Sequence, residues 1–127
     1  MDKVVHFEVP ADNMTRAQKF YQTVFGWGIN EMPDIGYTLV QTVAMDEKQM
    51  MPKESGAING GLFKREAAKK YPIITIEVPN IEEAAKIITA NGGKMTQEKM
   101  PVGDMGFTAY FTDSEGNLTG LWETVKK

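Results

Sequence analysis

The chain has 127 residues, about the length of one domain, so we expect a single domain over residues 1–127. Hydrophobic residues make up 42% and charged residues 24%, a balance that excludes a disordered chain or a collagen-like fibre. The 14 basic and 17 acidic residues give a net charge of −3 without a strongly basic cluster, which argues against a nucleic-acid partner. Cysteine is absent, which excludes disulfides, thiolate metal sites and thiol nucleophiles.

The start of the chain indicates a cytoplasmic protein without a membrane partner. Residues 1–3 lead directly into a strand-like pattern rather than into the apolar core of a signal peptide. The sequence contains no run of about 18 apolar residues, the length that a membrane-spanning helix needs.

The first half of the chain predicts a strand, a helix and then further strands. Residues 4–9 form a β-branched run that we expect to end at Pro10. Asn13 can cap a helix that ends at Gly26 in a left-handed conformation. Apolar residues recur at helical spacing and predict its buried stripe: Ala17, Phe20, Tyr21, Val24 and Phe25. Strands are expected at 37–43 and 57–64, separated by a loop at 46–55.

The second half repeats this plan. A strand is expected at 73–78 and a helix at about 81–90, which ends at the glycines after Asn91. The next strand, around 94–99, is weak by propensity. Strands at 107–112 and 118–124 follow, joined by a hairpin turn at 113–117.

Two short repeated sequence segments indicate a duplicated module. The segment 7–10 (Phe-Glu-Val-Pro) recurs at 76–79 as Ile-Glu-Val-Pro, and 61–63 (Gly-Leu-Phe) recurs at 120–122 as Gly-Leu-Trp. Strands that resemble each other by composition alone are the alternative explanation. We predict an α+β fold of two tandem βαβββ modules, at about 1–66 and about 70–127. The sheet face that each helix leaves uncovered is expected to line an open cleft.

Strand alternation predicts which side chains this cleft carries. Val5, Phe7 and Val9 would lie under the first helix, and Ile74, Ile76 and Val78 under the second. The repeat places Glu8 and Glu77 at equivalent positions of the two modules and matches His6 with Thr75. Gly61 and Gly120 would leave the floor of the sheet open.

The candidate catalytic residues are His6 and Glu8, because a histidine and a glutamate on one face of a strand can act as an acid/base pair. With Glu77 they could instead offer three metal contacts, and a lone histidine can also be a packing residue. Candidate substrate-binding residues are the acid, amide and aromatic side chains expected near the cleft: Glu77, Trp27, Tyr37, Asn59, Phe63 and Trp122. For these aromatic residues a purely structural role in the core is the alternative.

Three segments together resemble the vicinal oxygen chelate superfamily of glyoxalases, bleomycin-resistance proteins and extradiol dioxygenases. They are 5–10 (Val-His-Phe-Glu-Val-Pro), 17–27, which ends in Val-Phe-Gly-Trp, and the hairpin at 113–117 that leads into 120–123. The resemblance spans essentially the whole chain. It is strongest to small proteins related to lactoylglutathione lyase, and it implies paired βαβββ modules and a homodimer.

The resemblance also bears on metal binding. Metal-dependent members hold a divalent ion with one side chain from the first and one from the last strand of each module. Here the first-strand positions fall on His6 or Val4 and on Ile73, and the last-strand positions fall at or beside Gly61 and Gly120. One imidazole offers too few donors for a firmly held ion, so we expect no metal ligands and no cofactor, although weak binding of a divalent metal through His6 is left open.

Three functions remain open from the sequence. The first is a metal-free protein of the bleomycin-resistance kind that binds or sequesters a small-molecule ligand. The second is a lyase or isomerase of the lactoylglutathione-lyase-related type that uses His6 and Glu8 as acid and base. The third is an interaction module whose open face is covered by a second subunit.

Overall fold

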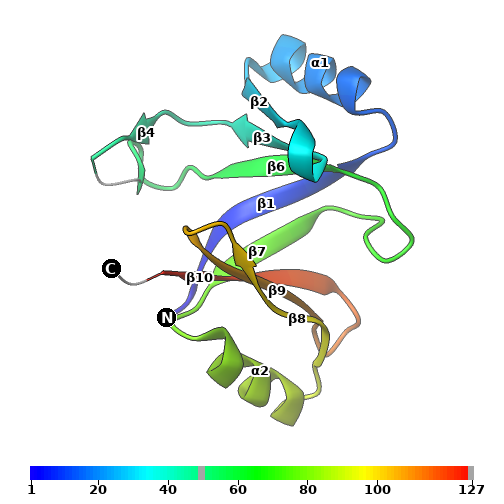
Figure 1. The fold of residues 1–127 in the computed structure, drawn as a ribbon, viewed down its shortest axis with the longest axis vertical. Helices are drawn as coiled ribbons and strands as arrows, with labels where there is room; N and C mark the ends of the chain where they lie inside the picture. The colour runs from blue at the N-terminus through cyan, green and yellow to red at the C-terminus, as the bar shows by residue number, and fades with distance from the viewer. Residues whose placement is uncertain (49–50, 126–127) are drawn as a thin grey trace. The chain divides into compact units, whose positions relative to one another are not determined.

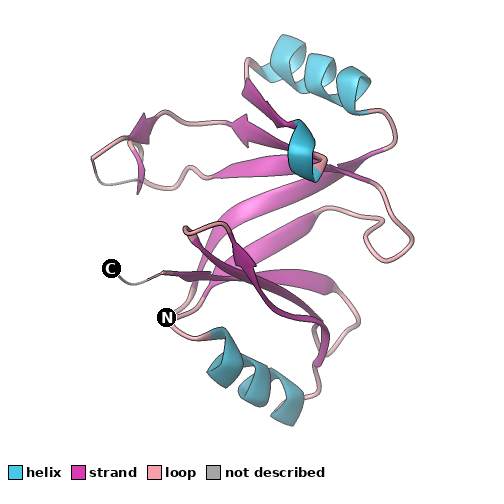
Figure 2. Ribbon diagram, viewed as in Figure 1, coloured by secondary structure: helices cyan, strands magenta, loops and turns pink. Residues whose placement is uncertain are grey.

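The computed structural model describes residues 1–48 and 51–125, and it divides into two compact units. The N-terminal unit comprises His6–Pro72, and the C-terminal unit comprises Ile73–Lys127 together with Met1–Val5. Each unit has one α-helix and one four-stranded run of sheet (Figure 2), so the α+β class and the duplicated βαβββ layout are confirmed. In the described part of the chain, no helix is long and apolar enough to span a membrane.

The N-terminal unit arranges its strands in the order β2-β3-β6-β1. Strand β6 runs parallel to β1 and antiparallel to β3, and β2 pairs antiparallel with β3 (Figure 1). Its elements, in chain order, are β1 (Lys3–Ala11), α1 (Met14–Phe25), β2 (Gly28–Met32), the 3-10 helix η1 (Pro33–Ile35), β3 (Tyr37–Gln41), β4 (Met45–Asp46), β5 (Met51–Pro52) and β6 (Asn59–Lys64).

The C-terminal unit has the matching order β7-β10-β9-β8, in which the last strand again lies beside the first and parallel to it. Its elements are β7 (Ile73–Glu77), α2 (Ile81–Ala90), β8 (Lys94–Val102), β9 (Gly106–Thr112) and β10 (Leu118–Thr124). The weak strand predicted at 94–99 is a nine-residue strand that pairs with β9 through two irregularities in register.

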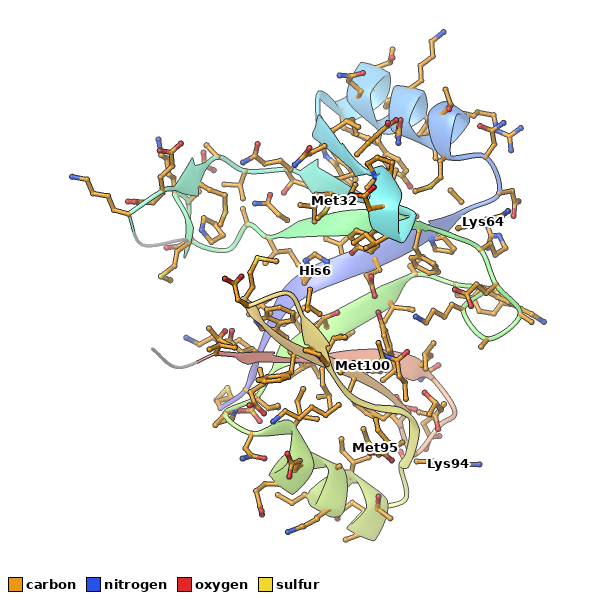
Figure 3. All side chains as sticks on the ribbon, viewed as in Figure 1. His6, Met32, Lys64, Lys94, Met95 and Met100 are labelled. Carbon is orange, nitrogen blue, oxygen red and sulfur yellow. The ribbon has the colours of Figure 1, made fainter. Side chains whose placement is uncertain are left out.

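The helix ends follow the sequence rules. Asn13 accepts a hydrogen bond from the backbone N–H of Arg16, and Gly26 closes α1 with φ of 72°. Asn80 caps α2 through the N–H of Glu83. The core of the C-terminal unit lies under α2 and consists of Val78, Ile81, Ala109, Phe111 and Leu121, with Ile76, Ala84, Ile88, Met95 and Phe107 packed against it (Figure 3 labels Met95).

Several boundaries differ from the prediction. Strand β1 continues through Pro10 to Ala11, because an extended backbone suits the fixed φ of proline and Pro10 lies one residue from the strand end. Strand β2 was not predicted, and β3 and β6 are shorter than expected. The loop predicted at 46–55 contains the small β4–β5 hairpin, and its residues 49–50 lie outside the described part of the chain.

The predicted burial of two apolar sets is wrong in part. No residue of α1 is buried: Phe20 and Phe25 are 54% and 59% exposed, because the helix turns its partly covered side, with Ala17 and Tyr21, toward the sheet. Ile74 is 50% exposed rather than covered by α2, since that helix packs on β8, β9 and β10.

Candidate functional site

The alternation predicted for β1 is correct within the N-terminal unit. Phe7 packs against Trp27, whose ring stacks on Tyr21 of α1 at a centroid distance of 4.6 Å. Phe7 therefore lies on the helix side of the sheet. His6 and Glu8, one residue away in either direction, lie on the opposite face (Figure 3 labels His6 on β1).

The face opposite α1 brings together five of the predicted site residues. The register sets His6 beside Asn59, Glu8 beside Gly61, and Tyr37 beside Phe63. Residues paired across neighbouring strands share a face, so the side chains of His6, Glu8, Tyr37, Asn59 and Phe63 all project from this side.

His6 and Tyr37 are joined directly. The Nε2 atom of His6 lies 2.9 Å from the hydroxyl oxygen of Tyr37, in a partly buried hydrogen bond. Burial lowers the pKa of His6 below its ordinary value, and the nearby Glu8 carboxylate opposes this shift without reversing it. The imidazole is therefore neutral at neutral pH. The carboxylate of Glu8 is itself buried, with 6% of the residue exposed.

The side chains of Asn59 and Phe63 are engaged by neighbouring parts of the N-terminal unit. The side-chain oxygen of Asn59 accepts hydrogen bonds from the backbone N–H groups of Thr42 and Val43, at 2.8 and 3.0 Å. Its amide nitrogen contacts the sulfur of Met45 at 3.1 Å. Asn59 thus fixes the chain that leaves β3, and Phe63 is buried in the sheet.

Trp27 does not join this group. It lies among the aromatic side chains beside α1, on the helix side of the sheet, within ring-contact distance of Phe7, Tyr21 and Phe25. The geometry matches the packing role that the sequence left as its alternative.

The remaining candidates, Glu77 and Trp122, lie together in the C-terminal unit. The indole N–H of Trp122 donates to the hydroxyl oxygen of Thr124 at 3.1 Å, and that hydroxyl donates to Oε2 of Glu77 at 3.0 Å. Glu77 and Thr124 also line a cavity of about 490 Å³. Its other lining residues are Met1, Asp2, Lys3, Val78, Pro79 and Val125. A cavity of about 420 Å³ around Asp12, Arg65 and Tyr71 contains none of the predicted site residues.

The predicted equivalence of Glu8 with Glu77 is wrong. Glu8 pairs with Gly61, but the residue that pairs with Gly120 is Thr75, and Glu77 pairs with Trp122. When the two units are aligned by the pairing of their first and last strands, Glu8 corresponds to Thr75. The alignment suggested by the repeated Glu-Val-Pro segment is therefore shifted by two residues. A shift of two residues keeps each side chain on its face and changes only its neighbours.

The sheet floor is not open at the two glycines, contrary to expectation. A Cβ atom added to Gly61 would lie 2.0 Å from the hydroxyl oxygen of Tyr37, and one added to Gly120 would lie 2.7 Å from the hydroxyl oxygen of Thr75. Each glycine makes room for a hydroxyl group that lies over it. The space over each glycine is occupied by a side chain of the same sheet.

Potential metal donors are sparse. Within residues 1–48 and 51–125, no three histidine, cysteine, aspartate or glutamate side chains come together as a metal-binding group. His6 and Glu8 are the donor side chains on their face of β1, and Gly61 beside them contributes none.

The chain is similar to known proteins along most of its length. Residues 3–43 match the family model described as bleomycin resistance protein-like N-terminal. A lactoylglutathione lyase of Haemophilus influenzae is 28% identical over 118 residues, which cover 90% of this chain and 87% of that protein. The Mycobacterium tuberculosis protein CFP32, whose name describes it as a glyoxylase, is 25% identical over 91% of this chain; the match spans only 43% of that longer protein.

Solved structures show the same fold. A methylmalonyl-CoA epimerase of Streptomyces coelicolor superposes with a TM-score of 0.66 at 15% identity, and the match covers 98% of each chain. A glyoxalase/bleomycin resistance protein/dioxygenase superfamily member from Vibrio splendidus gives a TM-score of 0.62 at 15% identity over 98% of this chain and 100% of that chain.

Proposed function

We propose that the chain is a member of the vicinal oxygen chelate superfamily of glyoxalases, bleomycin-resistance proteins and dioxygenases, and that it binds a small organic ligand without the divalent ion used by metal-dependent members. One observation carries this proposal. The last-strand positions at which those members supply metal ligands fall at or beside Gly61 and Gly120, and a hydroxyl group lies over each of these glycines.

The donor set supports the metal-free reading. The first-strand positions fall on His6 or Val4 and on Ile73, and the last-strand positions fall at or beside Gly61 and Gly120, which have no donor side chain. The hydroxyls of Tyr37 and Thr75 are neutral and are weak ligands compared with the carboxylates and imidazoles that hold divalent ions in proteins. The residues present do not fit a firmly held metal ion.

The ligand that suits these side chains carries hydrogen-bond donors. The face of the N-terminal sheet opposite α1 carries the carboxylate of Glu8 and the hydroxyl group of Tyr37. Carboxylates favour ammonium, guanidinium or hydroxyl groups. We therefore propose a cationic or hydroxyl-bearing small molecule as the ligand.

Metal content tests the proposal. Protein purified without chelator is expected to contain far less than one equivalent of nickel, zinc, iron or manganese. EDTA should leave its Tm unchanged, and small organic cations should raise it, since a ligand at about 100 times its Kd adds about 2.7 kcal/mol of stability. Stoichiometric metal that EDTA removes, with a fall in Tm, would overturn the metal-free assignment.

A second candidate is a lyase or isomerase in which His6 and Glu8 form the acid/base pair, with either residue as the general base. The neutral imidazole favours it, because a neutral ring can accept a proton from a carbon next to a carbonyl group, and the buried Glu8 carboxylate lies on the same face. The lactoylglutathione lyase of Haemophilus influenzae, to which the chain is similar, has a name that places it in this class.

Two variants separate the candidates. In a pure binding protein, His6→Ala and Glu8→Gln are expected to weaken ligand affinity by roughly tenfold, about 1.4 kcal/mol, and no turnover should be found in wild type. In an enzyme the same changes should lower kcat by about 100-fold or more. Calorimetry and turnover assays on the same preparations distinguish the two. Turnover that survives both changes would remove these residues as acid and base.

A further inference from the structure

Two asparagines of the chain are each followed by two glycines, at 59–61 and at 91–93. The backbone nitrogen that follows an asparagine can attack Cγ of its side-chain amide, which makes asparagine a chemically labile residue. A following glycine favours the attack, because it has no Cβ to block the approach and its backbone rotates freely. Since both sites have the sequence Asn-Gly-Gly, a difference in their reactivity must come mainly from the structure around them.

The first site lies inside the sheet of the N-terminal unit. Gly60 is buried in β6 and pairs on both sides, with β1 and with β3. A Cβ atom on Gly60 would lie 2.4 Å from the carbonyl oxygen of Phe7, so the neighbouring strand packs directly against its backbone. The side-chain oxygen of Asn59 accepts hydrogen bonds from the N–H groups of Thr42 and Val43. Attack on Asn59 therefore requires the sheet to open.

The second site lies just past the end of α2, and both Asn91 and Gly92 are exposed. The N–H of Asn91 donates to the carbonyl oxygen of Ile88 at 3.1 Å, and its side-chain nitrogen donates to that of Ile87 at 2.8 Å. The N–H of Gly92, which carries the attacking nitrogen, makes no hydrogen bond to any residue that the structure describes. Helix ends fray at little cost in free energy, so breaking two exposed hydrogen bonds releases Asn91 for the reaction.

We propose that Asn91 is a site of spontaneous covalent modification, at which the backbone nitrogen of Gly92 displaces the side-chain amide. A bond forms between this nitrogen and Cγ of Asn91, the bond from Cγ to Nδ2 breaks, and Nδ2 leaves as ammonia with the proton of the Gly92 amide. Water then opens the cyclic imide at either carbonyl group and gives aspartate or isoaspartate. Water is the only co-reactant, and Asn59 keeps its amide while the sheet is folded.

The modification places a negative charge at the C-terminal end of α2. The last carbonyl groups of a helix already carry partial negative charge, so a carboxylate there is unfavourable. A carboxylate also cannot donate a hydrogen bond, and the carbonyl oxygen of Ile87 loses the donor that Asn91 supplies. Ile88, the next residue, packs against the core of the C-terminal unit. We therefore expect the product to be less stable at the end of α2 that covers this core.

Peptide mapping by mass spectrometry tests the proposal on the full-length protein, incubated at mildly alkaline pH with and without urea. In the folded protein the amide of Asn91 should be lost at least about tenfold faster than that of Asn59, with isoaspartate among the products. In urea, where both sites are unfolded, the two rates should become similar. Equal rates in the folded protein, or a folded protein in which Asn91 keeps its amide while the unfolded chain reacts, would overturn the proposal.

Variants test the reaction and its consequence separately. Asn91→Gln should stop the loss of the amide at this position, because the longer side chain would have to form a larger ring. Asn91→Asp reproduces the charge of the product and should lower Tm by about 2–4 °C. The matched control is Asn30→Asp, which adds the same charge at an exposed position of β2 and should leave Tm within about 1 °C of wild type. Equal Tm values of the two aspartate variants would overturn the expected effect on α2.

Discussion

Gly60→Ala is expected to destabilise the protein by about 3 kcal/mol, the upper end of the usual cost of overpacking a core. Gly60 pairs with Phe7 where β6 and β1 run parallel. An added Cβ would lie 2.4 Å from the carbonyl oxygen of Phe7 and 2.7 Å from two atoms of its ring. The ring could move only by leaving Trp27, and the carbonyl only by separating the two strands. Urea unfolding followed by tryptophan fluorescence measures the loss.

Gly28→Ala is the matched control. Gly28 also lies in a paired strand of the N-terminal unit, but its added Cβ would come no closer than 3.3 Å to any neighbour, the Cβ of the Gln41 side chain. A shift of a few tenths of an ångström accommodates that contact, so the cost should stay within about 0.5 kcal/mol. Equal stability of the two variants would show that β1 and β6 separate easily, contrary to the packing described above.

The faces of the strands could be predicted from the sequence because their signal is local. In β1 the apolar Phe7 and Val9 alternate with His6 and Glu8, and a period of two leaves only one way to cover the apolar side. The ends of α1 were predictable for the same reason, since Asn13 and Gly26 satisfy backbone groups within one turn of themselves.

The register between strands was not predictable, because it depends on residues far apart in the chain. The repeat of Phe-Glu-Val-Pro suggested that Glu8 and Glu77 are equivalent, yet only the pairing with β6 and β10 shows that Thr75 corresponds to Glu8. A register shift of two residues leaves the alternation of side chains between the two faces intact, so the pattern of apolar residues does not reveal such a shift.

The hydrogen bond between Tyr37 and His6 in the candidate site could not be predicted from the sequence either. Tyr37 and His6 are 31 residues apart, and their hydrogen bond depends on a glycine in a third strand. The sequence did single out Gly61, but absence of a side chain does not reveal what fills the space. Strand β2 was missed because Asn30 and Glu31 are poor strand formers, and it lies at the end of the strand order in its unit.

Among the acidic residues of the C-terminal unit, the partly buried Glu123 is expected to contribute most to stability. Its Oε1 accepts from the backbone N–H of Ile81, the first residue of α2, at 2.7 Å, and its Oε2 lies 3.1 Å from Nζ of Lys99. The side chain of Glu123 is 14% exposed, and Ile81 is almost fully buried. One carboxylate therefore joins β10, β8 and the start of α2.

Glu123→Ala should lower the free energy of unfolding by about 2 kcal/mol, since a buried N–H left without an acceptor costs about 1–3 kcal/mol. Lys99 is left with Glu82, so the pKa of the lysine, which Glu123 raises more than any other group, should fall toward its ordinary value. Glu82→Ala removes the other carboxylate that Lys99 contacts, but Glu82 is exposed, and the change should cost less than about 0.5 kcal/mol. Urea unfolding of the two variants gives the comparison. A Glu82→Ala variant as unstable as Glu123→Ala would mean that the lysine pairing, rather than the hydrogen bond to the start of α2, supplies the stability.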